Sequence, residues 1–176
     1  MIDEVYDIFN DAWEKIGMAT WTEVHARGLL HENATIMIFK DVTKNEFLVQ
    51  HRGSGMAHDP GKLTNSAGGH LLAGMSADEG ARKELQEELF AGHELPNISL
   101  TKIKTFLNED FPGNREILNV YEGVYPGPFY FEEKELEHPP EWMLWDDLIT
   151  DLRAQPEKYT QVLKNILKEA HHISLN

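Results

Sequence analysis

The chain contains no cysteine, which excludes disulfide bonds, thiolate metal sites and a cysteine nucleophile. It is also poor in basic residues: 16 Lys and Arg stand against 30 Asp and Glu, so the formal net charge is −14. A field of this sign repels nucleic-acid backbones and anionic membranes. We therefore expect no nucleic-acid polymer as a partner, and an anionic substrate would need a cation to bridge it to the protein.

Long apolar runs are missing as well. No stretch of about 18 apolar residues is present, so we expect no membrane span. The acidic start at Asp3 and Glu4 lacks the basic and apolar regions of a signal peptide, which, with the missing cysteines, predicts a cytoplasmic protein. The length of 176 residues and the absence of a long linker predict one domain over residues 1–176.

The hydrophobic pattern alternates between helical and strand-like periods. Apolar residues three or four apart over residues 5–16 predict a first helix. Later helices are expected at about 76–89 and from Pro156 through Leu167. Strands are expected at 34–39, 46–50, 98–107, 116–124 and 141–145. This order favours a mixed α/β or α+β fold that contains antiparallel hairpins.

The helix expected at 76–89 carries the residues with the clearest chemistry. At about 100° per residue, Glu84, Glu87 and Glu88 share one side of it, and Glu84 and Glu88 border its apolar stripe. Like charges at these spacings repel, whereas a hard divalent cation such as Mg²⁺ or Mn²⁺ would use them as ligands. The alternative is a solvated acidic face that is neutralised by Arg82 and Lys83.

Residues 69–91 resemble the Nudix box, which reads Gly, five residues, Glu, seven residues, then Arg-Glu-aliphatic-x-Glu-Glu-x-Gly-aliphatic. The matching positions are Gly69, Glu84, Leu85, Glu87, Glu88 and Ala91. The departures are Met75 for the first Glu, Lys83 for Arg and Phe90 for the last Gly. Flanking segments resemble the branch of the superfamily that includes isopentenyl-diphosphate isomerase-like proteins; these segments are 23–31, 47–52 and 60–70.

The resemblance implies an α/β/α sandwich with a mixed sheet and a loop–helix–loop box, in which the core spans about residues 20–150 between N- and C-terminal helical additions. It implies that Glu87 and Glu88 bind Mg²⁺ or Mn²⁺ and that Glu84 is a ligand or the catalytic base. A carbonyl near Gly68 or Gly69 would complete the site. The implied activity is cleavage of a small-molecule diphosphate, such as a nucleoside diphosphate linked to another group.

The departures from the box favour a second hypothesis, a weakly active or inactive module that binds a phosphorylated ligand. Met75 cannot support a metal site as a Glu does, and Lys83 lacks the rigid fork of Arg. Phe90 cannot easily take the positive φ that Gly allows after a helix.

Histidines suggest a further site. The resemblance to the isomerase, which binds a metal with histidines and carboxylates, makes His25, His31 and His70 candidates for a second metal site; the alternative is that they are hydrogen-bonded structural groups. The isomerase also uses a Cys in the stretch that reads Asn65-Ser-Ala-Gly68 here, so isomerase activity is not expected.

Several single residues keep two interpretations. Glu116 is expected either to join the metal site or act as the base, or to be an edge-strand charge. Arg52, Lys62 and Arg115 are candidates for binding phosphate, since a cation supplies directed donors to its oxygens, or are solvated surface groups. The oligomeric state stays open, with a homodimer as one option.

Overall fold

The computed structural model of the chain describes residues 3–55, 58–131 and 138–175. Its strands are β1 (Val5–Phe9), β2 (Lys15–Thr20), β3 (Leu30–Phe39), β4 (Glu46–His51), β5 (Leu63–Thr64), β6 (Ala67–His70), β7 (Thr101–Asn108), β8 (Arg115–Val124) and β9 (Glu141–Leu144). Its helices are α1 (Trp21–Arg27), α2 (Ala77–Leu89), α3 (Trp145–Ala154) and α4 (Gln161–His171), with a 3₁₀ turn, η1 (Pro156–Lys158). Every helix within these ranges is too short or too polar to serve as a membrane span.

The long strand β3 organises a mixed sheet. It pairs in parallel with β8 over its whole length, from Leu30 opposite Arg115 to Phe39 opposite Val124. It also pairs antiparallel with β6, β1 and, at one end, β4. The remaining antiparallel pairs among the described strands are β1 with β2, β4 with β5, β4 with β9 and β7 with β8. The sheet therefore contains both kinds of pairing, as the sequence predicts.

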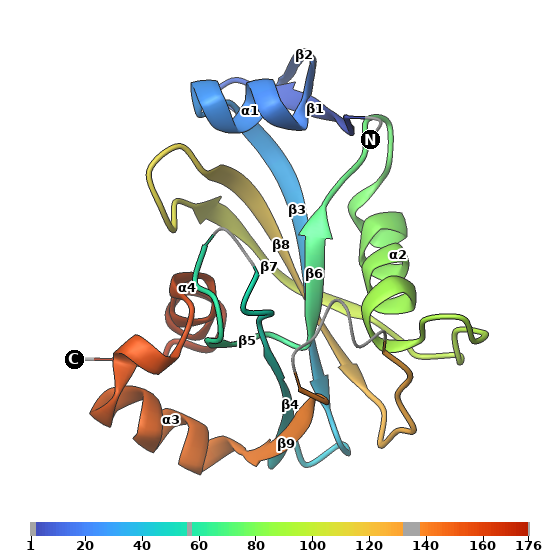
Figure 1. The fold of residues 1–176 in the computed structure, drawn as a ribbon, viewed down its shortest axis with the longest axis vertical. Helices are drawn as coiled ribbons and strands as arrows, with labels where there is room; N and C mark the ends of the chain where they lie inside the picture. Colours follow the sequence, from blue (N-terminus) through green and yellow to red (C-terminus); the bar gives the residue numbers. More distant parts are fainter. Residues whose placement is uncertain (1–2, 56–57, 132–137, 176) are drawn as a thin grey trace.

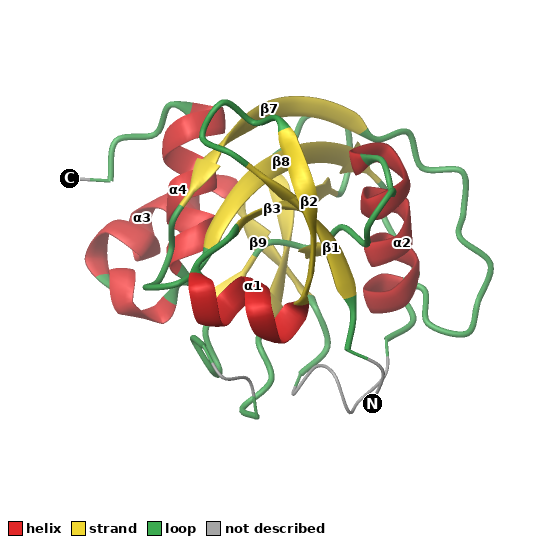
Figure 2. Cartoon of the chain, turned by 90° about the horizontal axis from the view of Figure 1, so that it is seen from above, coloured by secondary structure: helices red, strands yellow, loops and turns green. Residues whose placement is uncertain are grey.

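Helices cover both faces of the sheet (Figures 1 and 2). Side chains alternate along β3, so Ile36 and Ile38 pack with the apolar stripe of α2, whereas Met37 and Phe39 pack with α3 and α4. The predicted α/β/α sandwich is thus confirmed. Each face has its own core, and the box helix α2 is held against one of them.

The predicted first helix over residues 5–16 is wrong. These residues form β1, a turn and the start of β2, which cross one end of the sheet beside α1 (Figure 1). The side chain of Asn10 accepts hydrogen bonds from the backbone N–H groups of Ala12 and Glu14, and Trp13 takes a positive φ of 62°. Asn favours such local turns over a helix interior, which explains the failure of the periodicity argument.

The other predicted elements are largely present. The helix α2 begins as expected, with reciprocal capping-box hydrogen bonds between Ser76 and Glu79. The helix predicted from Pro156 onward is interrupted at Tyr159, whose extended backbone separates η1 from α4 and whose hydroxyl donates to Asp151. The helices α1 and α3 were not predicted.

Candidate active site

A cleft of about 370 Å³ collects residues from α1, β3, β4, β6, α2 and β8. Gly68, Gly69 and His70 of β6 line it, together with Glu88 of α2 and Glu116 of β8. The pairing of β3 with β6 on one side and β8 on the other brings these distant segments together. Most of the residues singled out in the sequence therefore belong to one region of the fold.

The three candidate histidines lie together beside this cleft, which His25 and His70 line. His25, His31 and His70 each offer a ring nitrogen, and these atoms lie within 4.8 Å of one another. His31 is fully buried, with Nδ1 2.9 Å from the carbonyl oxygen of Leu29. A neutral ring that donates from Nδ1 leaves a lone pair on Nε2, and this buried atom has no hydrogen-bond partner among the described residues.

Burial favours the uncharged form of two of these rings. Burial lowers the pKa of His31 to about 4, and burial also lowers the pKa of His25. Near neutral pH both rings are uncharged, as a metal ligand must be. The trio therefore fits a divalent cation that accepts imidazole nitrogen.

Glu116 faces the same group of residues from the centre of the sheet. Its carboxylate accepts hydrogen bonds from Asn33 Nδ2 at 2.9 Å and from Asn108 Nδ2 at 2.8 Å, and it lies 3.2 Å from Nε2 of His70. Burial alone would raise its pKa, but the interactions with His70 and Asn108 lower the pKa to about 2. The interpretation as an edge-strand charge is wrong, because β8 pairs on both sides.

The box carboxylates have three different surroundings. Glu84 is 8% exposed and lies against Gly69, where an added Cβ would stand 2.7 Å from the Glu84 carboxyl carbon. Glu88 lines the cleft and accepts a hydrogen bond from Gln50 Nε2 at 3.0 Å. Glu87 is exposed. Burial raises the pKa of Glu84 above its ordinary value.

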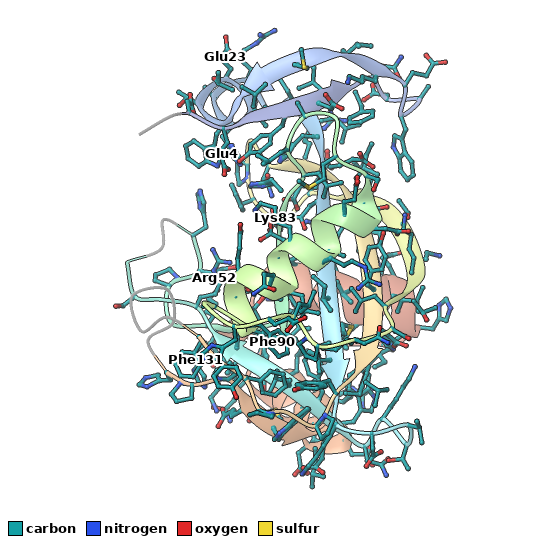
Figure 3. All side chains as sticks on the ribbon, turned by 90° about the vertical axis from the view of Figure 1, so that its right-hand side faces the viewer. Glu4, Glu23, Arg52, Lys83, Phe90 and Phe131 are labelled. Atoms are coloured by element: carbon teal, nitrogen blue, oxygen red, sulfur yellow. The ribbon has the colours of Figure 1, made fainter. Side chains whose placement is uncertain are left out.

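Lys83 contacts two of these carboxylates, with Nζ 3.1 Å from Glu84 Oε1 and 2.6 Å from Glu87 Oε2. It lies on the α2 side that faces the viewer in Figure 3. Glu87 therefore fits the alternative interpretation, in which an acidic side chain is solvated and neutralised by Lys83. This interpretation does not describe Glu84 and Glu88, which are turned toward the sheet and the cleft.

Phe90 does not disturb the end of the box helix. It adopts a negative φ of −136° and packs, almost fully buried, against Tyr125 and Phe129. The positive φ, 71°, is taken by Gly92 two residues later. The expected conflict at Phe90 is thus absent, because the turn is displaced along the chain.

The three candidate phosphate-binding cations differ in whether they line the cleft. Arg52 lines the cleft and donates from Nε to the carbonyl oxygen of His58 at 3.2 Å. Lys62 Nζ lies 2.7 Å from Asp59 Oδ1, and Lys62 does not line the cleft. Arg115 pairs with Asp11 and Glu109. Only Arg52 of these three is therefore placed to meet a ligand in the cleft.

Sequence reasoning missed the amides that hold the carboxylates. Gln50, Asn33 and Asn108 come from β4, β3 and β7, and they donate to Glu88 or Glu116. Asn108 in turn accepts from Asn165 of α4 at 2.7 Å. No local pattern distinguishes these amides, because their partners are far away in the sequence.

Comparisons with known proteins agree with this architecture. The NUDIX domain model matches residues 29–166, and the chain belongs to this family. Nudix proteins are generally pyrophosphohydrolases that use divalent metals such as Mg²⁺ or Mn²⁺.

Individual relatives are of two kinds. The chain is 29% identical to an isopentenyl-diphosphate Delta-isomerase of Serratia proteamaculans, over 96% of this chain and 92% of the relative. It is 31% identical to an uncharacterized Nudix hydrolase of Clostridium acetobutylicum, over 94% and 76% of the two chains. A solved structure from Deinococcus radiodurans shares the fold with a TM-score of 0.78 at 20% identity, covering 96% of this chain and 99% of that one.

Proposed function

We propose that this chain is a divalent-metal-dependent pyrophosphohydrolase acting on a small diphosphate compound, such as a nucleoside diphosphate linked to another group. One observation carries the proposal: Glu88 of the box helix, His70 and Glu116 line a single cleft, although they come from three separate elements. A hydrolase of this family needs its metal-binding carboxylates to open onto a space that admits the substrate, and this cleft meets that need.

The charge of the cleft requires cations. One cation, Arg52, and four carboxylates line it: Asp59, Glu88, Asp110 and Glu116. With the histidines neutral, the formal charge of the lining is therefore 1 − 4 = −3. A diphosphate adds further negative charge, so the protein alone would repel it. Divalent ions held by these residues would offset this repulsion and, when bound, would activate water for attack on the diphosphate.

Two sets of residues could hold such ions. Glu84, Glu87 and Glu88, with a carbonyl of Gly68 or Gly69, offer the oxygen ligands that Mg²⁺ or Mn²⁺ prefers; Glu87 would have to release Lys83. The second set is the histidine trio, His25, His31 and His70, which offers nitrogen ligands.

The two candidate bases differ in proton affinity. A general base works best with a pKa near the working pH. Burial raises the pKa of Glu84, whereas His70 and Asn108 hold the pKa of Glu116 at about 2. We therefore assign proton transfer to Glu84 and assign to Glu116 the role of an ionised ligand or anchor for His70. Arg52 is the protein group placed to hold a phosphate oxygen.

The relatives named as isomerases raise a second activity. The matching stretch here reads Thr64-Asn-Ser-Ala-Gly-Gly-His70, and it contains no cysteine. Because the isomerase to which the sequence is similar uses a Cys there, we favour hydrolysis over isomerisation. The contact of Lys83 with Glu84 and Glu87 favours the other alternative, a binding module without turnover.

One assay separates these activities. Purified protein is incubated with Mg²⁺ or Mn²⁺ and a panel of diphosphate compounds that includes isopentenyl diphosphate, and products are identified by mass spectrometry. We expect phosphate-containing hydrolysis products from the wild type and at least a 100-fold loss in Glu88→Gln. An isomerised product would support the isomerase. Ligand-induced thermal stabilisation without any product would support the binding module.

A further inference from the structure

A series of side-chain amides connects the surface of α4 to Glu116. Gln161, exposed in the first turn of α4, donates from Nε2 to Asn165 Oδ1 at 2.8 Å. Asn165 donates from Nδ2 to Asn108 Oδ1 at 2.7 Å, and Asn108, which is fully buried, donates from Nδ2 to Glu116 Oε2 at 2.8 Å. We call Gln161, Asn165 and Asn108 the amide relay. It links the C-terminal helix to a carboxylate at the centre of the candidate site.

All three amides of the relay are oriented in the same direction. An ionised carboxylate only accepts hydrogen bonds, so Asn108 must turn its nitrogen toward Glu116. The oxygen of Asn108 then faces Asn165, which must also present its nitrogen, and the oxygen of Asn165 is left to accept from Gln161. The orientation of the whole relay therefore depends on one buried negative charge, and its linked hydrogen bonds polarise one another.

The other oxygen of Glu116 is held in a similar manner. Asn33 donates from Nδ2 to Oε1 at 2.9 Å, and the Oδ1 atom of Asn33 accepts from the Thr35 hydroxyl at 3.3 Å. The same Oε1 lies 3.2 Å from Nε2 of His70. Because Glu116 is only 3% exposed, these amides replace the water that would otherwise solvate its charge. Both oxygens are thus fixed, and with them the placement of the carboxylate beside His70.

We propose that Asn108 and Asn165 are positioning residues that hold the Glu116 carboxylate beside His70, so that α4 supports metal binding although neither amide lines the cleft. The inference rests on the proposed function only in the metal-binding role of Glu116 and His70. Loss of a partner that orients a metal-binding group typically lowers metal affinity by about 10-fold to 100-fold. An amide with a purely structural role would leave this affinity unchanged.

The first test reverses the relay without changing its shape. Melting temperatures of the metal-free protein are measured for Asn165→Asp, Glu116→Gln and the double variant. A carboxylate at position 165 cannot donate to Asn108, so we expect Asn165→Asp to lower the melting temperature by about 5 °C. The same change should cost less than half as much in the Glu116→Gln background, because an amide at position 116 can donate to an Asn108 side chain that has turned over.

Gln155→Glu is the matched control, since it also converts an amide to a carboxylate. Gln155 donates from Nε2 to Asp151 Oδ1 at 2.9 Å and does not line the cleft. We expect Gln155→Glu to cost the same in the wild-type and Glu116→Gln backgrounds.

The second test measures Mn²⁺ affinity by titration calorimetry. We expect Asn165→Asp to bind Mn²⁺ about tenfold more weakly than the wild type, and Gln155→Glu to bind it unchanged. If Glu116→Gln does not fold, this measurement decides alone, because it uses the wild-type Glu116.

The outcomes separate the relay from the proposed function. Equal costs of Asn165→Asp in the two backgrounds would refute the relay, and an unchanged Mn²⁺ affinity of Asn165→Asp would refute its positioning role. Both expected results without hydrolysis of any diphosphate would refute the function and leave the relay standing. Hydrolysis by the wild type with equal costs and unchanged affinity would do the reverse. No Mn²⁺ binding by the wild type would overturn both.

Discussion

Replacing Gly69 with alanine should disable the site without removing any charged group. A Cβ at this position would stand 2.7 Å from the carboxyl carbon of Glu84, whereas ordinary van der Waals contact begins at 3.4 Å. The carboxylate must therefore retreat by at least 3.4 − 2.7 = 0.7 Å. Because a catalytic group misplaced by about 1 Å can cost about 100-fold in rate, we expect kcat/KM to fall by about that factor.

The measurement is a double-mutant cycle on diphosphate hydrolysis with Mn²⁺. Gly69→Ala, Glu84→Gln and the double variant are compared with Gly17→Ala, a control in which the added Cβ meets Ile8 at an ordinary 3.7 Å. If Gly69 acts by positioning Glu84, the double variant should be little worse than Glu84→Gln alone. Wild-type activity of Gly69→Ala, or effects that simply multiply, would refute this reasoning.

Three further predictions concern metal and proton binding. Glu88→Gln should reduce hydrolysis by at least tenfold more than Glu87→Gln, because Glu88 lines the cleft and Glu87 is exposed; equal losses in steady-state assays would contradict this placement. Saturating Mn²⁺ should raise the melting temperature of the wild type by about 5 °C, and a chelator should reverse this rise. The rise should be smaller in His31→Phe. A rise in His31→Phe equal to that of the wild type, measured by calorimetry, would exclude His31 as a ligand. Burial lowers the pKa of His171 in the folded chain, so as the pH falls below about 6.5 the unfolded chain binds a proton at this residue before the folded chain does, and the free energy of unfolding decreases. Denaturation at several pH values should therefore show a shallower decrease of this free energy in His171→Gln than in the wild type. Identical slopes would contradict this.

The wrongly predicted helix over residues 5–16 and the missed helix α1 show that local patterns were insufficient to predict the secondary structure near the N-terminus. Apolar residues three or four apart fit residues 5–16 to a helix, but a short hairpin with a bulge produces a similar spacing. The turn around Asn10 and the burial of Tyr6 against Ala19 of β2 and Val24 of α1 decide in favour of strands. These contacts involve partners that a periodicity argument does not see.

The candidate site likewise has features that local sequence patterns predict and features that depend on the tertiary structure. Glu84 and Glu88 were placed correctly relative to the apolar stripe of α2 because a helix positions its side chains by a fixed rotation per residue. The distinction between the cleft-lining Glu88 and the exposed Glu87 needed the sheet. So did the exclusion of Lys62 and Arg115, neither of which lines the cleft.

Sequence alone determined the acidic character of the chain, the absence of thiol chemistry, the start of the box helix at Ser76 and the family resemblance. All of these depend on composition or on residue types within short stretches of the sequence. Only the tertiary structure decided that His25, His70 and Glu116 line one cleft with Glu88 and that His31 lies beside His25 and His70, because this proximity depends on the register of β3 with β6 and β8. Strand register is set by packing between segments that are distant in the chain, and short-range patterns carry little information about it.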